Sequence, residues 1–172
     1  MARQPAQPSL FWPIIGTALF VLLIPGTVVG VIPFLLSRWR IQPALLGFVG
    51  VRWIGAAMLL LAAPLFADFV VRFVREGRGT PAPIAPTQRL VVGGPFRYTR
   101  NPGYIGVIGL LVGQGLVFGS PAVLLYAGCV TIAFHLFVLL YEEPTLRRQF
   151  GRQYIEYCQR VPRWIPSRRG RG

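Results

Sequence analysis

The chain has 172 residues, enough for one domain, and 53% of them are hydrophobic, which exceeds the usual apolar share of a soluble domain. Its 18 basic residues are all arginine and face only 5 acidic residues, so the net charge is +13. Because this charge accompanies long apolar runs and no groove-reading motif, it argues against nucleic-acid binding and for arginines that flank a bilayer. Cys129 and Cys158 are isolated, which argues against a metal or redox site.

The first half of the chain holds two apolar runs, and we predict an all-α polytopic membrane protein that forms one domain over its whole length. A transmembrane helix needs roughly 20 apolar residues. The first span is expected within residues 10–36, where its length far exceeds a signal-peptide core and its prolines predict either a bend or an early end of the helix. The second is placed at 53–72, because an earlier start would bury Arg52. Near its end Asp68 and Arg72 are four residues apart and are expected to pair.

The second half predicts a helical hairpin. Residues 101–141 contain no Asp, Glu, Lys or Arg, and they divide at a Gly-Ser-Pro turn into a short third span at 102–118 and a fourth at 121–141. With these, about four transmembrane helices are expected. The third span carries glycines at 103, 106, 109, 113 and 115, and their bare surface allows another backbone to approach closely.

Arginines predict the sidedness of the hairpin. The connection at about 74–100, which we expect to be a cytosolic loop, and the C-terminal region are rich in arginine, whereas the turn between the last two spans has none. The positive-inside rule therefore places the loop and the C-terminus in the cytoplasm, although Arg38 and Arg40 fall on the other side. Residues 144–160 have the apolar spacing of an amphipathic interfacial helix, and a basic tail follows at 167–172.

Polar residues at the end of the fourth span are the first candidates for chemistry. Glu142 and Glu143 leave the bilayer together, and the following Pro144 predicts a kink at Glu143. Either glutamate can simply cap the next helix and offset Arg147 or Arg97; alternatively, because adjacent carboxylates repel, the pair can be relieved by a bound cation.

His135 lies seven residues before Glu142, and Thr131 lies four residues before His135. On a helix these two side chains share one face, which we expect to point into the bundle. His135 is interpreted either as a packing residue or, for an amine or hydroxyl substrate, as a general base. Asp68 and Arg72 need no role beyond their pairing.

An arginine–aromatic block precedes the third span. Arg97 and Arg100 can each bind a carboxylate in bidentate geometry, through two N–H groups of the guanidinium, and Phe96, Tyr98 and Tyr104 offer faces to a flat ring or a cation. Pro102 is expected to start the third span. Taken alone, this block is also typical of an aromatic belt at a membrane rim.

Four motifs in a fixed order are more specific for a protein family than any one of them alone. Gly94–Tyr104 (GPFRYTRNPGY), Glu142–Glu143, Phe150–Tyr154 and Val161–Pro166 together resemble the isoprenylcysteine carboxyl methyltransferase family and are similar to the related phospholipid N-methyltransferases. The resemblance covers about residues 75–166.

The resemblance implies an integral membrane methyltransferase that uses S-adenosylmethionine on a lipid or lipophilic substrate that enters from the membrane. We expect no metal among its ligands. It places the cofactor near the cytosolic ends of the last spans. Asn101 stands where many members have histidine, and its amide cannot become charged. The implied cofactor-binding residues are Arg97, Tyr98, Arg100, Asn101, Pro102, Tyr104, Glu142 and Glu143, and the candidate catalytic residues are Arg100, Glu142 and His135.

Two other functions are compatible with this layout. Some membrane sterol reductases that use NADPH resemble it, and a non-catalytic protein can keep the scaffold to bind a lipid. The intact glutamate pair argues against the second alternative.

Overall fold

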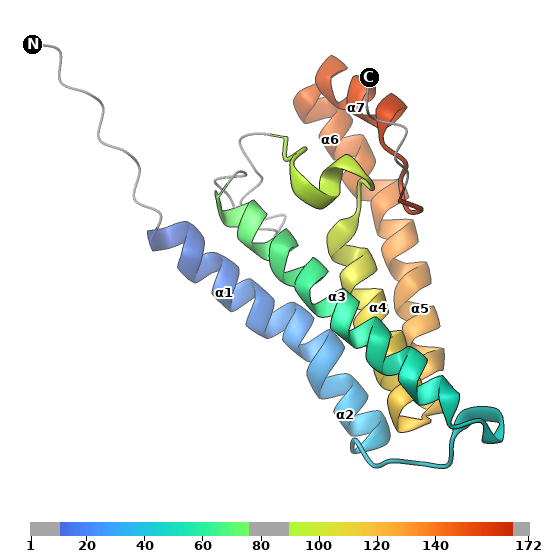
Figure 1. Ribbon diagram of the computed structural model, residues 1–172. Coiled ribbons are helices and arrows are strands. Elements are labelled where there is room, and N and C mark those ends of the chain that lie inside the picture. The colour runs from blue at the N-terminus through green and yellow to red at the C-terminus, as the bar shows by residue number, and fades with distance from the viewer. Residues whose placement is uncertain (1–10, 76–89, 167–172) are drawn as a thin grey trace, which may run out of the picture.

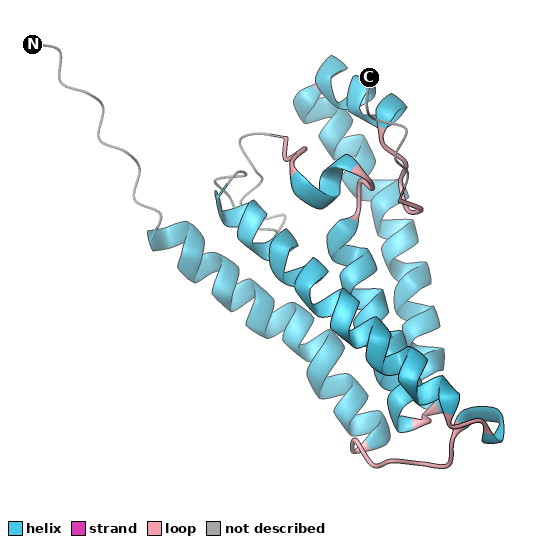
Figure 2. Ribbon diagram, viewed as in Figure 1, coloured by secondary structure: helices cyan, strands magenta, loops and turns pink. Residues whose placement is uncertain are grey.

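The computed structural model describes residues 11–75 and 90–166, and these residues form helices joined by short loops, without a strand (Figures 1 and 2). This confirms the all-α prediction. The expected basic tail and most of the 74–100 loop lie outside the described residues. The elements are α1 (Phe11–Pro25), η1 (Gly26–Val31), α2 (Ile32–Ser37), η2 (Leu45–Gly47), α3 (Gly50–Arg75), η3 (Gly94–Arg97), α4 (Pro102–Phe118), α5 (Pro121–Phe137), η4 (Val138–Glu142), α6 (Glu143–Phe150) and α7 (Arg152–Arg160).

The first span is one rod made of α1, a π-helical segment η1, and α2 (Figure 1). A π-turn leaves backbone carbonyls without their usual helical partners. Two side chains from other helices meet this need: Gln114 Nε2 donates to Val29 O at 2.9 Å, and Tyr126 OH donates to Val28 O at 3.2 Å. The rod is thereby tied to α4 and α5 by hydrogen bonds.

Helices α3 and α4 pack against each other over most of their lengths, as the glycines of α4 predicted. A Cβ built on Gly55 of α3 lies 2.8 Å from the carbonyl oxygen of Gly113, and one built on Gly106 lies 3.0 Å from Phe66. A backbone separation this small leaves no room for a side chain. The glycine face is therefore the contact that fixes α4 beside α3.

The bounds of the last two spans follow from local sequence. Helix α4 covers the expected 102–118, with Pro102 in its first turn, where proline's missing N–H loses nothing. It ends at Gly119, which has a φ of +66°, and Ser120 then caps α5 by accepting from the Val123 N–H.

Among the described residues, three helices are long and apolar enough to cross a membrane: Ala18–Ser37, Gly50–Arg72 and Pro121–Phe150. Pro102–Phe118 is apolar but shorter. Arg52 lies in the first turn of α3, and Asp68 pairs with Arg72 at 2.8 Å as expected.

The C-terminal region differs from the single helix expected at 144–160. It forms α6 and α7, which meet at Gly151, whose φ is +52°. A positive φ is open to glycine and interrupts the helix there. The expected amphipathic division holds: Tyr154 is buried, and Arg147, Arg148 and Arg152 are exposed.

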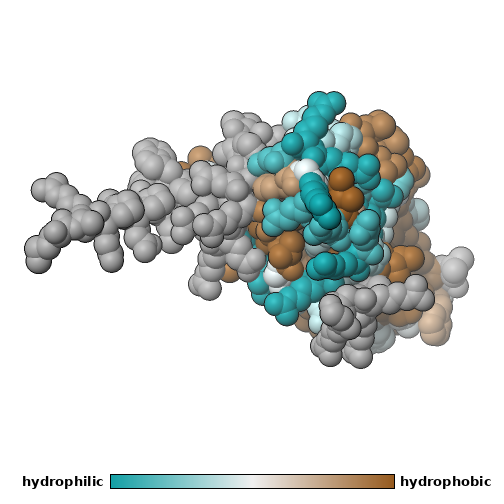
Figure 3. All heavy atoms as spheres, turned by 90° about the horizontal axis from the view of Figure 1, so that it is seen from above, coloured by the Kyte–Doolittle hydropathy of each residue, from teal (hydrophilic) through white to brown (hydrophobic). Residues whose placement is uncertain are grey.

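The described parts of both arginine-rich regions, which include η3, α6 and α7, lie at one end of the bundle with the start of α4, while the α4–α5 turn lies at the other end (Figure 1). Seen from above, hydrophilic atoms gather over this end and hydrophobic atoms border them (Figure 3). The arginine–aromatic block Gly94–Tyr104 and the twin glutamates therefore share one side of the molecule.

Candidate functional site

The π-helical segment η4 sets the direction of the twin glutamates. Here the Glu143 N–H bonds to Val138 O, five residues earlier, so Glu143 follows Val138 on one face, and both residues are buried. The expected kink at Glu143 is wrong, because its φ of −61° and ψ of −43° are helical. The helix continues through this wider turn into α6, where Pro144 has no N–H to donate to a helical hydrogen bond.

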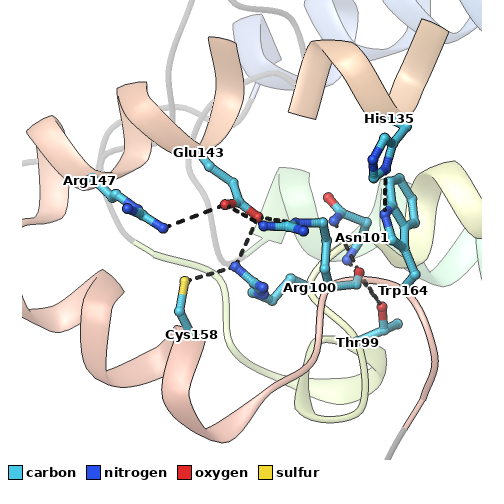
Figure 4. Close-up of polar contacts among 9 residues, drawn as sticks. Thr99, Arg100, Asn101, His135, Glu143, Arg147, Cys158 and Trp164 are labelled. Carbon is cyan, nitrogen blue, oxygen red and sulfur yellow. Dashed lines mark hydrogen bonds and ion pairs between the residues drawn. The ribbon is translucent and has the colours of Figure 1, made fainter. Parts of the chain in front are cut away.

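Glu143 is the centre of an arginine cluster (Figure 4). Arg163 holds it with two bonds, Nε to Oε1 at 2.6 Å and Nη2 to Oε2 at 3.1 Å. Arg100 Nη1 donates to Oε1 at 2.9 Å, and Arg147 Nη2 lies 3.7 Å from Oε2. One buried carboxylate thus faces three guanidinium groups, and the cluster keeps a net positive charge. The bond to Glu143 raises the pKa of Arg163, so this guanidinium stays charged.

Glu142 lies beside that cluster with a different partner. Its Oε2 accepts a hydrogen bond from the Tyr104 OH at 2.7 Å. The Tyr104 ring in turn lies 4.7 Å from that of Phe134 and 6.4 Å from that of Trp164. Glu142 is therefore bordered by aromatic rings, and no ion pair to it is formed within the described part of the chain.

The segment Val161–Pro166, which we call the strap, ties the arginine–aromatic block to the C-terminal helices. The Arg163 carbonyl accepts from Thr99 Oγ1 at 3.0 Å and from Asn101 Nδ2 at 3.1 Å. Pro162 O accepts from the Arg100 N–H at 2.9 Å. These bonds fix the backbone from which Arg100 reaches Glu143.

A second link joins α7 to the same block. Tyr157 OH donates to Phe96 O at 2.7 Å, and the Phe96 ring packs 6.1 Å from that of Phe69 on α3. Burial raises the pKa of the Tyr157 phenol. Cys158, on the same helix, accepts from Arg100 Nη1 at 2.9 Å.

His135 lies on α5 before the glutamates. The expectation that Thr131 and His135 point into the bundle is wrong, because both side chains are exposed. His135 Nδ1 accepts a hydrogen bond from Trp164 Nε1 at 3.0 Å, and the two rings lie 5.9 Å apart (Figure 4). The strap thus contacts both the glutamate cluster and the outer side of α5.

The structure brings most of the predicted site residues together. Arg100, Asn101, Tyr104, Glu142 and Glu143 are connected through the bonds above, and Pro102 is buried at the start of α4. Arg97 and Tyr98, by contrast, have exposed side chains on η3 and its C-terminal edge, and within the described residues no hydrogen bond joins them to either glutamate.

Two further residues of the site, Arg163 and Trp164, were not predicted as site residues and were named only within the Val161–Pro166 motif. Their position in Val161–Pro166 was the available signal, but nothing local indicates that this segment returns to Glu143 and His135.

Comparison with known proteins gives one family match and several relatives. The model of a family described as phospholipid methyltransferase matches residues 51–153. Over 78 residues, the chain is 36% identical to "Protein-S-isoprenylcysteine O-methyltransferase B" from Arabidopsis thaliana, covering 45% of this chain and 40% of that protein. It is 35% identical over 78 residues to "Probable protein-S-isoprenylcysteine O-methyltransferase" from Oryza sativa subsp. indica, covering 45% of this chain and 41% of the relative.

The chain thus spans about two fifths of the length of the curated relatives it matches. No solved structure matches it.

Proposed function

Since this chain belongs to the phospholipid methyltransferase family, we propose that it transfers a methyl group from S-adenosylmethionine to a lipid or lipophilic small molecule in the membrane. The observation that carries the proposal is the meeting of the two predicted clusters. Arg100 lies 2.9 Å from Glu143, and Tyr104 lies 2.7 Å from Glu142, although the chain runs through two helices between them.

The chemistry of this cluster fits an S-adenosylmethionine carboxylate. The cluster carries an excess of guanidinium charge around one carboxylate. Arg100 Nε is buried and has no hydrogen-bond partner within the described part of the chain. An unsatisfied buried donor costs about 1–3 kcal/mol, and an anionic oxygen of a ligand would remove that cost. Arg100 is therefore our candidate for the group that holds the carboxylate.

The two glutamates divide their roles in this proposal. Glu143 is a positioning residue, because its two oxygens already accept from Arg100 and Arg163. Glu142 accepts from Tyr104 alone among the described residues, so it retains capacity for the ribose hydroxyls or the ammonium of the cofactor. The neighbouring rings of Tyr104, Phe134 and Trp164 suit the sulfonium cation.

S-adenosylmethionine supplies an activated methyl group, and transfer is an in-line displacement. The task left to the protein is to hold donor and acceptor in line and to exclude water. The names of the relatives make a prenylated cysteine the first acceptor to test, and the name of the matching family makes phospholipids the second. We place the site and the C-terminus on the cytoplasmic side from the arginine distribution.

The test is ligand binding to the purified protein in lipid nanodiscs. Titration with S-adenosylhomocysteine and with NADPH separates a methyltransferase, a reductase and a non-catalytic protein by binding of the first, the second or neither. We expect S-adenosylhomocysteine to bind and Glu142→Gln to weaken its binding about 10- to 100-fold, since a hydrogen bond to a charged group contributes about 1.5–3 kcal/mol.

Glu156→Gln is the matched control, because within residues 11–75 and 90–166 Glu156 pairs only with the exposed Arg152. Unchanged affinity in Glu142→Gln would remove Glu142 from the cofactor site. Binding of NADPH instead of S-adenosylhomocysteine would overturn the methyltransferase assignment.

A further inference from the structure

His135 is placed unusually for a polar residue of a transmembrane helix. It is exposed on α5, and Ile132 and Leu136 beside it are exposed too, so this face of α5 meets lipid. An ionisable side chain on such a surface is unfavourable unless a partner engages it. His135 therefore lies where the lipid-facing surface borders the site.

The bond to Trp164 determines which nitrogen of His135 carries the proton. An indole N–H can only donate, so Nδ1, at 3.0 Å from Trp164 Nε1, acts as the acceptor. In a neutral imidazole the proton is then on Nε2. Nε2 is thus a donor, and the nitrogen that could take up a proton is already occupied.

Trp164 also connects His135 to the cofactor side of the site. Its ring packs edge-on against Tyr104 at 6.4 Å, and Tyr104 donates to Glu142. A molecule that lies along the outer face of α5 with its polar end at His135 therefore reaches the aromatic border of Glu142.

We propose that His135 binds the substrate by donating its Nε2–H to an oxygen of the lipid headgroup, while the lipid tail lies along Ile132 and Leu136, and that Trp164 is the positioning residue that holds this tautomer. This inference rests on the proposed function and assigns His135 a donor role in place of a general base.

The first test uses the fact that the chain contains one histidine. Protein labelled with 15N-histidine in nanodiscs gives a single imidazole, and we expect the Nε2-protonated tautomer. Trp164→Phe should release Nδ1 and produce a mixture of tautomers. A wild-type spectrum with the proton on Nδ1 would overturn the proposal.

The second test measures substrate kinetics with a farnesylated cysteine and, separately, with phosphatidylethanolamine. For the acceptor that is methylated, we expect His135→Ala to raise KM about tenfold, the effect of one hydrogen bond, with little change in kcat. His135→Gln, which keeps a donor but cannot act as a base, should recover part of this loss. Cys129→Ala, at an exposed position of α5 about 120° around the helix axis from His135, is the control.

A fall in kcat that His135→Gln does not relieve, with KM unchanged, would overturn the donor role. Failure of the wild-type protein to bind S-adenosylhomocysteine would refute the proposed function instead, and it leaves the tautomer measurement unaffected.

Discussion

Replacing Glu143 with glutamine should destabilise the protein more than any other single charge removal at this end of the bundle. The side chain of Glu143 is only 6% exposed, and those of its partners Arg100, Arg163 and Arg147 are 12%, 31% and 59% exposed. The substitution leaves Arg100 buried beside other guanidinium groups without the carboxylate that compensates it.

The expected magnitude follows from these exposures. Removing one partner of a buried ion pair costs about 3–5 kcal/mol, because the remaining charge is left unpaired. The pair with Arg147 adds little, since exposed pairs contribute about 0–1 kcal/mol. We therefore expect Glu143→Gln to lower the free energy of unfolding by about 3–5 kcal/mol.

Reversible unfolding in mixed micelles measures this quantity. Glu156→Gln makes the same chemical change at an exposed pair on α7, and we expect a loss below about 0.5 kcal/mol. If Glu143→Gln loses no more than this control, the cluster contributes nothing to stability, and Glu143 cannot be the residue that positions Arg100.

Two further predictions concern packing and pH. Gly55→Val should lower the free energy of unfolding by about 1–3 kcal/mol, because its Cβ would lie 2.8 Å from the Gly113 carbonyl oxygen in the α3–α4 contact. Gly128→Ala is the control, because nothing lies within 4 Å of a Cβ at that position. Equal unfolding midpoints for the two variants would refute the predicted clash. Because burial raises the pKa of Tyr157, the unfolded phenol ionises first, at about pH 10. Stability should thus be retained below about pH 10 and fall as the pH rises further, and Tyr157→Phe should reduce the slope measured in alkaline unfolding.

Local sequence chemistry predicted the helices well. Pro102 and the Gly119–Pro121 turn mark the ends of α4 and the start of α5, and arginine placement predicted that two distant segments meet at one end. The break between α6 and α7 could also have been predicted from Gly151, since glycine permits the positive φ found there. The π-helical segment η1 has no comparable sequence signature, because its carbonyls are held by Gln114 and Tyr126 of other helices.

The sequence predicted which residues belong to the site, but it did not predict which of them contact one another. A motif indicated that Arg100 and the glutamates belong together, but which glutamate takes the arginines depends on the direction each leaves the helix. Arg163 returns to Glu143 across 20 residues and Trp164 to His135 across 29. Contacts of this kind are determined by tertiary packing, which local propensity does not describe.

The extra residue in η4 changes the helical phase between α5 and α6. In a regular α-helix, successive residues are about 100° apart around the axis, and the position that follows Val138 on the inner face would be Tyr141 or Glu142. The five-residue step selects Glu143 instead. Shortening Val138–Glu142 by one residue would turn the acidic pair by about that angle relative to α5, so spacing here matters as much as residue identity.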